Sequence, residues 1–270
     1  MTTSPVTPST PPPSAPVPSA AGPNAAPRIR RIAAQAGFET KEILRNGEQL
    51  MVTLLLPLIA LVLLTQTTLI EIDTDGLSKL DFMAPGIMAM AIMSASFTSQ
   101  AISTAFDRRN GVLRFLSTTP LGRGGLLGAK IFGVLAVELV QLVVIGAVAF
   151  GLGWRPSPVG LLLGVLVALL GTAAFTALAL LMAGTMRAEG VLALSNILLI
   201  LLVVGGAILV PASHMPGILG PLAQILPSGA LGEAMRAAFN TGTIPLTSAA
   251  VLAGWALVLG WAANRSFKWH

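Results

Sequence analysis

The chain has 270 residues, of which 54% are apolar and only 10% carry a charge, against about 25% in an average soluble domain. This number of charged side chains is too small to cover the surface of a soluble fold of this size. The composition therefore predicts an integral membrane protein. Cysteine is absent and there are only two histidines, so we expect no metal site on this chain. The net charge of +5 is explained by basic cytoplasmic loops, so we expect no nucleic-acid partner.

The first 48 residues contain no apolar run long enough to cross a membrane. Residues 1–27 hold nine of the 19 prolines and no charged side chain, which predicts a disordered cytosolic tail. Residues 28–48 alternate apolar and charged positions at helical spacing, and they abut a hydrophobic run. This pattern predicts an amphipathic helix that lies in the membrane interface.

Six apolar runs follow, each long enough for the roughly 30 Å hydrocarbon core of a bilayer. They cover residues 50–70, 82–106, 126–153, 157–186, 191–210 and 245–263. Residues 211–244 are moderately apolar but are interrupted by four prolines, which predicts two short external helices, within residues 216–239, that dip toward the bilayer. The predicted fold class is therefore an all-α membrane protein with six transmembrane helices in one domain, residues 49–264, and a cytosolic tail, residues 265–270.

The distribution of basic residues predicts the orientation of this bundle. Counted over loops and termini, 13 of the 16 lysines and arginines lie on one side of the predicted spans and three on the other. The basic side faces the cytoplasm. We therefore expect a multi-pass protein of the plasma membrane with both termini in the cytoplasm, which requires an even number of spans.

The loop after the second predicted span, DRRNGVLRFLSTTP at residues 107–120, is the most informative segment. It begins with charge, breaks at Gly111 and continues with apolar residues around Arg114, ending in Thr119 and Pro120. A short amphipathic helix outside the bilayer suits docking into a groove of a soluble partner. The alternative is an ordinary basic loop that only sets topology. The candidate docking residues are Asp107, Arg108, Arg109, Gly111, Leu113, Arg114, Phe115, Leu116, Thr119 and Pro120.

The same loop resembles the cytoplasmic coupling region of ABC-2 type transporter permeases, in which charged residues precede a glycine, a leucine-rich turn and Thr-Pro. The resemblance extends over residues 28–264 and includes the stretch 226–239, where Pro227 is followed by Arg236. The chain departs from the family at Arg109, where many members carry a glutamate; Asp107 is the nearest acid.

The resemblance implies a mechanism. Two permease subunits, as a homodimer or a heterodimer, would sit on two ATPase domains that bind ATP and Mg. The chain contains no Gly-Lys-Ser or Gly-Lys-Thr, so we expect no nucleotide cofactor and no catalytic site on it. The complex would export a hydrophobic or amphipathic compound, such as a drug-like or lipid-like molecule, and Pro227 and Arg236 would belong to an external gate.

Several polar residues fall inside predicted spans and are candidates for a translocation path. Glu138 lies near the middle of the third span with Gln141 nearly one turn on, and an ionisable side chain at that depth is a functional candidate. A polar stripe in the second span consists of Ser96, Ser99, Gln100 and Ser103. The alternative for all of them is helix packing through interhelical hydrogen bonds. Glu138 also leaves open a proton-coupled secondary transporter, and a purely structural membrane subunit is a third possibility.

Overall fold

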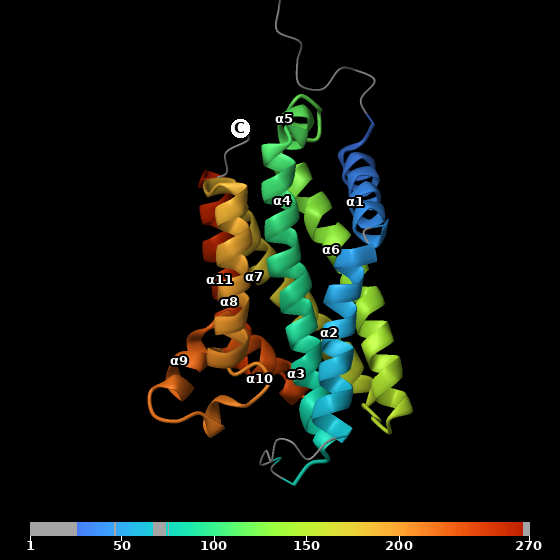
Figure 1. Cartoon of the computed structure of the whole chain (residues 1–270), viewed down its shortest axis with the longest axis vertical. Helices are drawn as coiled ribbons and strands as arrows, with labels where there is room; N and C mark the ends of the chain where they lie inside the picture. The colour runs from blue at the N-terminus through green and yellow to red at the C-terminus, as the bar shows by residue number, and fades with distance from the viewer. Residues whose placement is uncertain (1–25, 46, 67–73, 75, 267–270) are drawn as a thin grey trace, which may run out of the picture.

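The computed structural model describes residues 26–45, 47–66, 74 and 76–266, and this part of the chain is helical without a strand. The predicted all-α class is thereby confirmed. Figure 1 shows a bundle with α5 at one end and α9 and α10 at the other. The elements are α1 (Arg28–Arg45), α2 (Gly47–Gln66), α3 (Lys79–Met93), the π-helix η1 (Ser94–Ser99), α4 (Gln100–Arg109), α5 (Val112–Ser117), α6 (Gly122–Gly151), α7 (Pro158–Thr185), α8 (Ala188–Gly205), the 3-10 helix η2 (Ala212–His214), α9 (Leu219–Ile225), α10 (Pro227–Asn240) and α11 (Leu246–Ser266).

Five helical stretches in the described part are long and apolar enough to cross a membrane, and they match five of the predicted spans. They cover residues 79–109, 124–151, 158–185, 188–205 and 246–266. In the first predicted span, the apolar part of α2 covers residues 53–66 and is shorter than these five stretches. Residues 67–70 of the same predicted span lie outside the described part. The count of six spans therefore stays a prediction.

The predicted span 191–210 extends beyond the end of its helix. α8 ends at Gly205, and Ala207 then adopts a positive φ of 54°, which a helix cannot continue through. Two consecutive glycines, Gly205 and Gly206, weaken the helix at this point.

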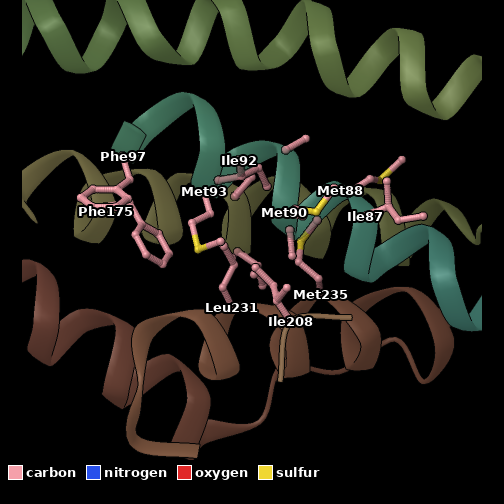
Figure 2. Packing of buried hydrophobic residues seen from close by; sticks show 14 of the residues in the cluster. Ile87, Met88, Met90, Ile92, Met93, Phe97, Phe175, Ile208, Leu231 and Met235 are labelled. Atoms are coloured by element: carbon pink, nitrogen blue, oxygen red, sulfur yellow. The ribbon is translucent and has the colours of Figure 1, made fainter. Parts of the chain in front are cut away.

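The central element is the continuous helix 79–109, which is formed by α3, η1 and α4. Of its most apolar 18 residues, 83% are buried. The face of this helix that packs against α7 and α10 is lined by methionine and small side chains (Figure 2). The rings of Phe97 and Phe175 lie with centroids 6.5 Å apart. One turn before Phe175 on α7, a Cβ atom at Gly171 would come within 2.6 Å of the Leu231 side chain of α10. Small residues thus allow the close van der Waals packing that drives helix association in a bilayer.

α1 packs lengthwise against the first part of α6. Gly125 and Gly128 face Ile32, and farther along both helices Gly133 faces Glu39. The two helices therefore run in the same direction, with glycines permitting close approach. This arrangement places α1 along the bundle, and its position relative to a lipid surface stays a prediction.

The two short helices predicted between the last two spans are present as α9 and α10. Pro227 occupies the first turn of α10, where its missing N–H leaves no intrahelical hydrogen bond unmade. The indole Nε1 of Trp255 donates to the carbonyl oxygen of Ile225 at 2.9 Å, which fastens α9 to α11. The depth of α9 and α10 in a membrane is a prediction.

Candidate docking site and buried polar clusters

The loop 107–120 folds as predicted into a short helix after a glycine break. Gly111 has a φ of 79°, a conformation that ends α4 and that glycine adopts without strain. α5 then presents two faces. Leu113 is fully buried against Leu126 of α6 and Leu180 of α7, whereas the side chain of Phe115 is 70% exposed. One face therefore anchors the helix, and the other leaves an aromatic ring uncovered at the end of the bundle.

Several hydrogen bonds fix the loop to its neighbours. The guanidinium of Arg108 donates to the carbonyl oxygen of Met186, and that of Arg31 in α1 donates to the carbonyl oxygen of Pro120. Arg109 forms an exposed ion pair with Glu189 at 2.6 Å. The Thr119 hydroxyl donates to the carbonyl oxygen of Leu116 at 2.6 Å. The segment is thus held against α1, α7 and α8 before any partner binds.

The structure divides the predicted docking residues into two groups. Arg109, Arg114, Phe115 and Pro120 are exposed. Asp107 and Arg108 turn toward the bundle instead, Leu113 lies in its core, and Gly111, Leu116 and Thr119 are half-buried. If the segment docks a partner, the docking surface would be centred on Phe115, whose side chain is the exposed aromatic group of α5.

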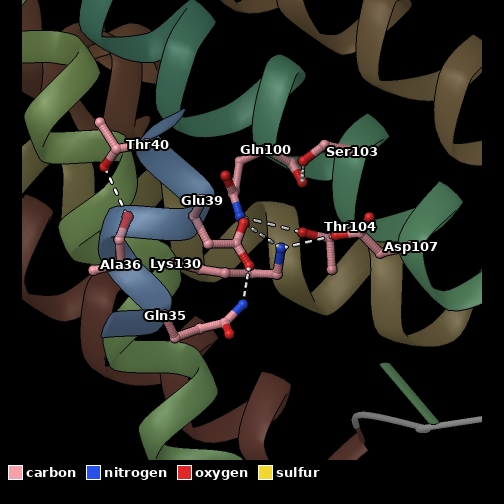
Figure 3. A network of polar contacts seen from close by, with 9 residues as sticks. All are labelled: Gln35, Ala36, Glu39, Thr40, Gln100, Ser103, Thr104, Asp107 and Lys130. Carbon is pink, nitrogen blue, oxygen red and sulfur yellow. Dashed lines mark hydrogen bonds and ion pairs between the residues drawn. The ribbon is translucent and has the colours of Figure 1, made fainter. Parts of the chain in front are cut away.

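Behind the docking segment lies a buried charge cluster that the sequence analysis did not predict (Figure 3). Lys130 of α6 is fully buried, and its Nζ lies 3.0 Å from Oε2 of Glu39 in α1 and 3.0 Å from Oδ2 of Asp107 in α4. The amide of Gln35 donates to the other Glu39 oxygen at 3.1 Å. We call Lys130, Glu39 and Asp107 the Lys130 triad. It joins three helices that are distant in sequence.

The surroundings of the triad carry further polar groups. Partial burial and the nearby carboxylates of Asp107 and Glu39 raise the pKa of Glu42 above its ordinary value. Gln100, which is buried beside the triad, donates to the Thr104 hydroxyl at 3.2 Å. This end of the bundle thus concentrates acids around a single buried lysine.

A second polar site surrounds Glu138 in the middle of α6. Its side chain is 2% exposed and accepts a hydrogen bond from the Thr172 hydroxyl of α7. The Ser96 hydroxyl of η1 lies beside the same carboxylate and donates to the carbonyl oxygen of Ile92 at 2.5 Å. π-helical turns are frequent at functional sites, because they displace side chains from the regular helical register. Glu138 therefore faces an irregular turn of the central helix.

The predicted polar stripe is divided between the two sites. Ser96 belongs to the Glu138 site and Gln100 to the surroundings of the triad, whereas Ser99 and Ser103 are half-buried. Gln141 donates to the carbonyl oxygen of Thr53 at 3.3 Å, which ties α6 to α2. Within the described residues, buried polar atoms without a hydrogen-bond partner occur on the same helices, at Thr98 Oγ1, Glu138 Oε1, Gln141 Oε1 and Thr176 Oγ1.

Replacing Glu138 with glutamine is expected to leave the amount of protein in the membrane unchanged and to alter transport. Glutamine keeps the size of the side chain and an oxygen that accepts from Thr172, but it removes the carboxylate. The measurement is transport rate as a function of pH, with membrane abundance as the control. Thr172→Val, which removes the hydroxyl that donates to Glu138 and to the Ala168 carbonyl oxygen but keeps the carboxylate, is the matched variant. Unchanged transport of Glu138→Gln at every pH would indicate a packing role.

At the opposite end, Arg236 holds the turn that follows α8. Its two terminal nitrogens donate to the carbonyl oxygens of Ile208 and Ala207, both at 3.0 Å, and one of them lies 3.4 Å from Glu233. Arg236 thus fixes the turn that follows α8 to α10. This contact is compatible with the predicted place of Pro227 and Arg236 in a gate, which stays a prediction.

The sequence contained a usable signal for two of the residues that were missed. Glu39 follows Ile32 and Ala36 at helical spacing, so it lies on the apolar face of α1, where an unpaired acid is costly. Lys130 lies eight residues before Glu138, on the same face of α6. Thr172 had no such signal, since its meeting with Glu138 depends on how α7 is rotated against α6.

The described residues form a helical bundle with five helices long and apolar enough to cross a membrane, which indicates a multi-pass membrane protein. A family model described as ABC-2 type transporter matches residues 32–240. A protein of Bacillus subtilis (strain 168) named "Putative transport permease YvfS" is 26% identical over 201 residues, which cover 72% of this chain and 80% of that protein. The chain belongs to the ABC-2 type transporter family and is a transport permease component. Members of this family generally pair with an ATPase subunit.

Proposed function

We propose that the chain is the membrane subunit of an ATP-driven exporter, with a separate ATPase subunit that binds ATP and Mg and docks at α5. The observation that carries this proposal is the uncovered ring of Phe115 on a helix whose other face is anchored by Leu113. An aromatic anchor beside Arg109 and Arg114, surrounded by charge, has the anatomy of a protein interface. In this arrangement α5 faces the cytoplasm, and two permease subunits face two ATPase domains.

The proposed substrate is a hydrophobic or amphipathic compound, drug-like or lipid-like. The described spans are lined mainly by aliphatic and methionine side chains, which suit an apolar molecule. The Glu138 site and its unpaired polar atoms would receive a polar group of such a substrate, since buried polar atoms need partners. ATP-driven closure of the ATPase domains would reach this path through the docking segment.

The proposed topology places both termini and α5 in the cytoplasm of a plasma-membrane protein with six spans. Single cysteines at positions 77 and 112 of this cysteine-free chain are expected to be labelled from opposite sides, because Leu77 and Val112 are exposed residues beside α3 and in α5, at opposite ends of the bundle (Figure 1). The measurement is modification by a membrane-impermeant maleimide in intact cells and in inside-out vesicles. Labelling of position 112 in intact cells would contradict the topology.

Reconstitution tests the exporter proposal against its rival. The tagged full-length chain is purified after mild cross-linking, and the co-purified polypeptide that carries a nucleotide-binding motif is identified. The two proteins are then reconstituted in liposomes with a fluorescent lipophilic dye. ATP-dependent dye movement is expected without an imposed pH gradient. Transport by the chain alone, driven by a proton gradient and abolished in Glu138→Gln, would instead establish the proton-coupled secondary transporter.

A further inference from the structure

The Lys130 triad contributes little to stability in relation to the desolvation that it requires. The ammonium group of Lys130 is fully buried and faces two carboxylates, so desolvation acts against all three charges and the cluster carries more negative than positive charge. Buried ion clusters are often replaced by apolar side chains without loss of stability, because the desolvation penalty offsets much of the attraction. Such a cluster does, however, specify one relative position of its three helices, since any displacement leaves a buried charge unpaired.

The three helices of the triad have distinct places in the proposed coupling. Asp107 lies four residues before Gly111, so it stands at the base of the docking helix. Glu39 belongs to α1, which also reaches the end of the docking segment through the hydrogen bond from Arg31 to Pro120. Lys130 belongs to α6, and Glu138 follows on the same face about 12 Å away at 1.5 Å per residue. The triad therefore links both ends of the docking segment to the span that contains the Glu138 site.

We infer that Lys130 is a positioning residue that makes α1, the docking segment and the first half of α6 move as one body, so that displacement of α5 by the ATPase reaches the Glu138 site. This inference rests on the proposed function. Lys130 touches neither substrate nor nucleotide in this arrangement. It acts by holding Asp107 and Glu39, and the close packing of Gly125, Gly128 and Gly133 against α1 adds a rigid contact surface next to the triad.

The test separates transmission of movement from stability by neutralising the triad in two ways. Lys130→Met alone leaves the buried carboxylate of Glu39 and the half-buried carboxylate of Asp107 without a cation, so its membrane abundance is expected to fall several-fold. The triple variant Lys130→Met, Glu39→Gln, Asp107→Asn removes every charge of the triad, and its abundance and thermal unfolding are expected to approach those of the wild type. Lys41→Met, an exposed residue of α1, controls for loss of a positive charge at this end.

The decisive measurement is made on the triple variant reconstituted with the ATPase subunit. ATPase binding is expected to be retained, because the exposed face of α5 is intact, while dye transported per ATP hydrolysed falls about tenfold, within the range of couplings carried by packed networks. A triple variant with wild-type transport per ATP would overturn the inference and leave the triad a structural feature. Loss of ATPase binding by this variant would also overturn it, since the triad would then act on docking. If the wild-type chain shows no ATP-coupled transport, the proposed function itself fails, which is a separate result from the first two.

Discussion

Replacing Phe115 with alanine is expected to weaken ATPase binding about thirtyfold while leaving the permease in the membrane at normal abundance. The ring is 70% exposed in the free chain, so its removal breaks no internal packing. Truncation of an aromatic anchor that becomes buried at an interface costs about 2 kcal/mol, which corresponds to that factor in affinity. The measurement is the dissociation constant of the ATPase from the purified permease, with membrane abundance as the control.

Two neighbours of Phe115 provide matched variants. Leu113→Ala removes the buried side chain that anchors α5 and is expected to lower the free energy of unfolding by about 2 kcal/mol, because it opens a cavity between α5, α6 and α7. Arg114→Glu is expected to reduce the association rate in a salt-dependent way, as rim charges do. If Phe115→Ala binds the ATPase with wild-type affinity, the segment 107–120 only sets the topology. The exposed ring of Phe115 then no longer supports the exporter proposal.

The features that were predictable from the sequence are those that depend on local composition. Apolar runs of about 20 residues can be recognised as spans because the bilayer imposes their length, and five of the six predicted runs are helices of that kind in the described residues. The short helix after Gly111 was predictable because a glycine that adopts a positive φ ends a helix within one residue. Neither conclusion requires knowledge of which helices are neighbours.

The features that were not predictable depend on neighbours or on backbone geometry. The helical spacing of Glu39 and Lys130 marks each of them as facing the bundle, but only the packing of α1 on α6 brings Lys130 to Glu39. Asp107 was assigned to docking because it opens a charged loop, whereas its carboxylate turns inward to the same lysine. The early end of α8 was hidden because residues 206–210 are as apolar as the helix before them, so hydropathy cannot distinguish a turn from another helical turn.

Replacing Gly229 with alanine is expected to destabilise the end of the bundle that contains α9 and α10. A Cβ atom at this position of α10 would lie 2.0 Å from the carbonyl oxygen of Ala223 in α9 and 3.0 Å from that of Gly206 after α8. Both neighbours are backbone atoms, which cannot rotate away as a side chain can. Relief of the clash therefore requires α9 or the turn after α8 to move, at a cost of about 3 kcal/mol by comparison with overpacked cores.

The matched control is Gly254→Ala in α11, where a Cβ atom would meet nothing within 4 Å. That substitution is expected to leave the melting temperature unchanged or to raise it slightly, because alanine is the better helix former by about 1 kcal/mol. Thermal unfolding and membrane abundance of the two variants give the comparison.

In the folded fraction of Gly229→Ala, ATPase binding at α5 should persist, because Gly229 lies at the opposite end of the bundle, while substrate release should change. If Gly229→Ala unfolds at the same temperature as Gly254→Ala, α9 and the turn after α8 are loosely held. Arg236 would then not fix a gate at this end.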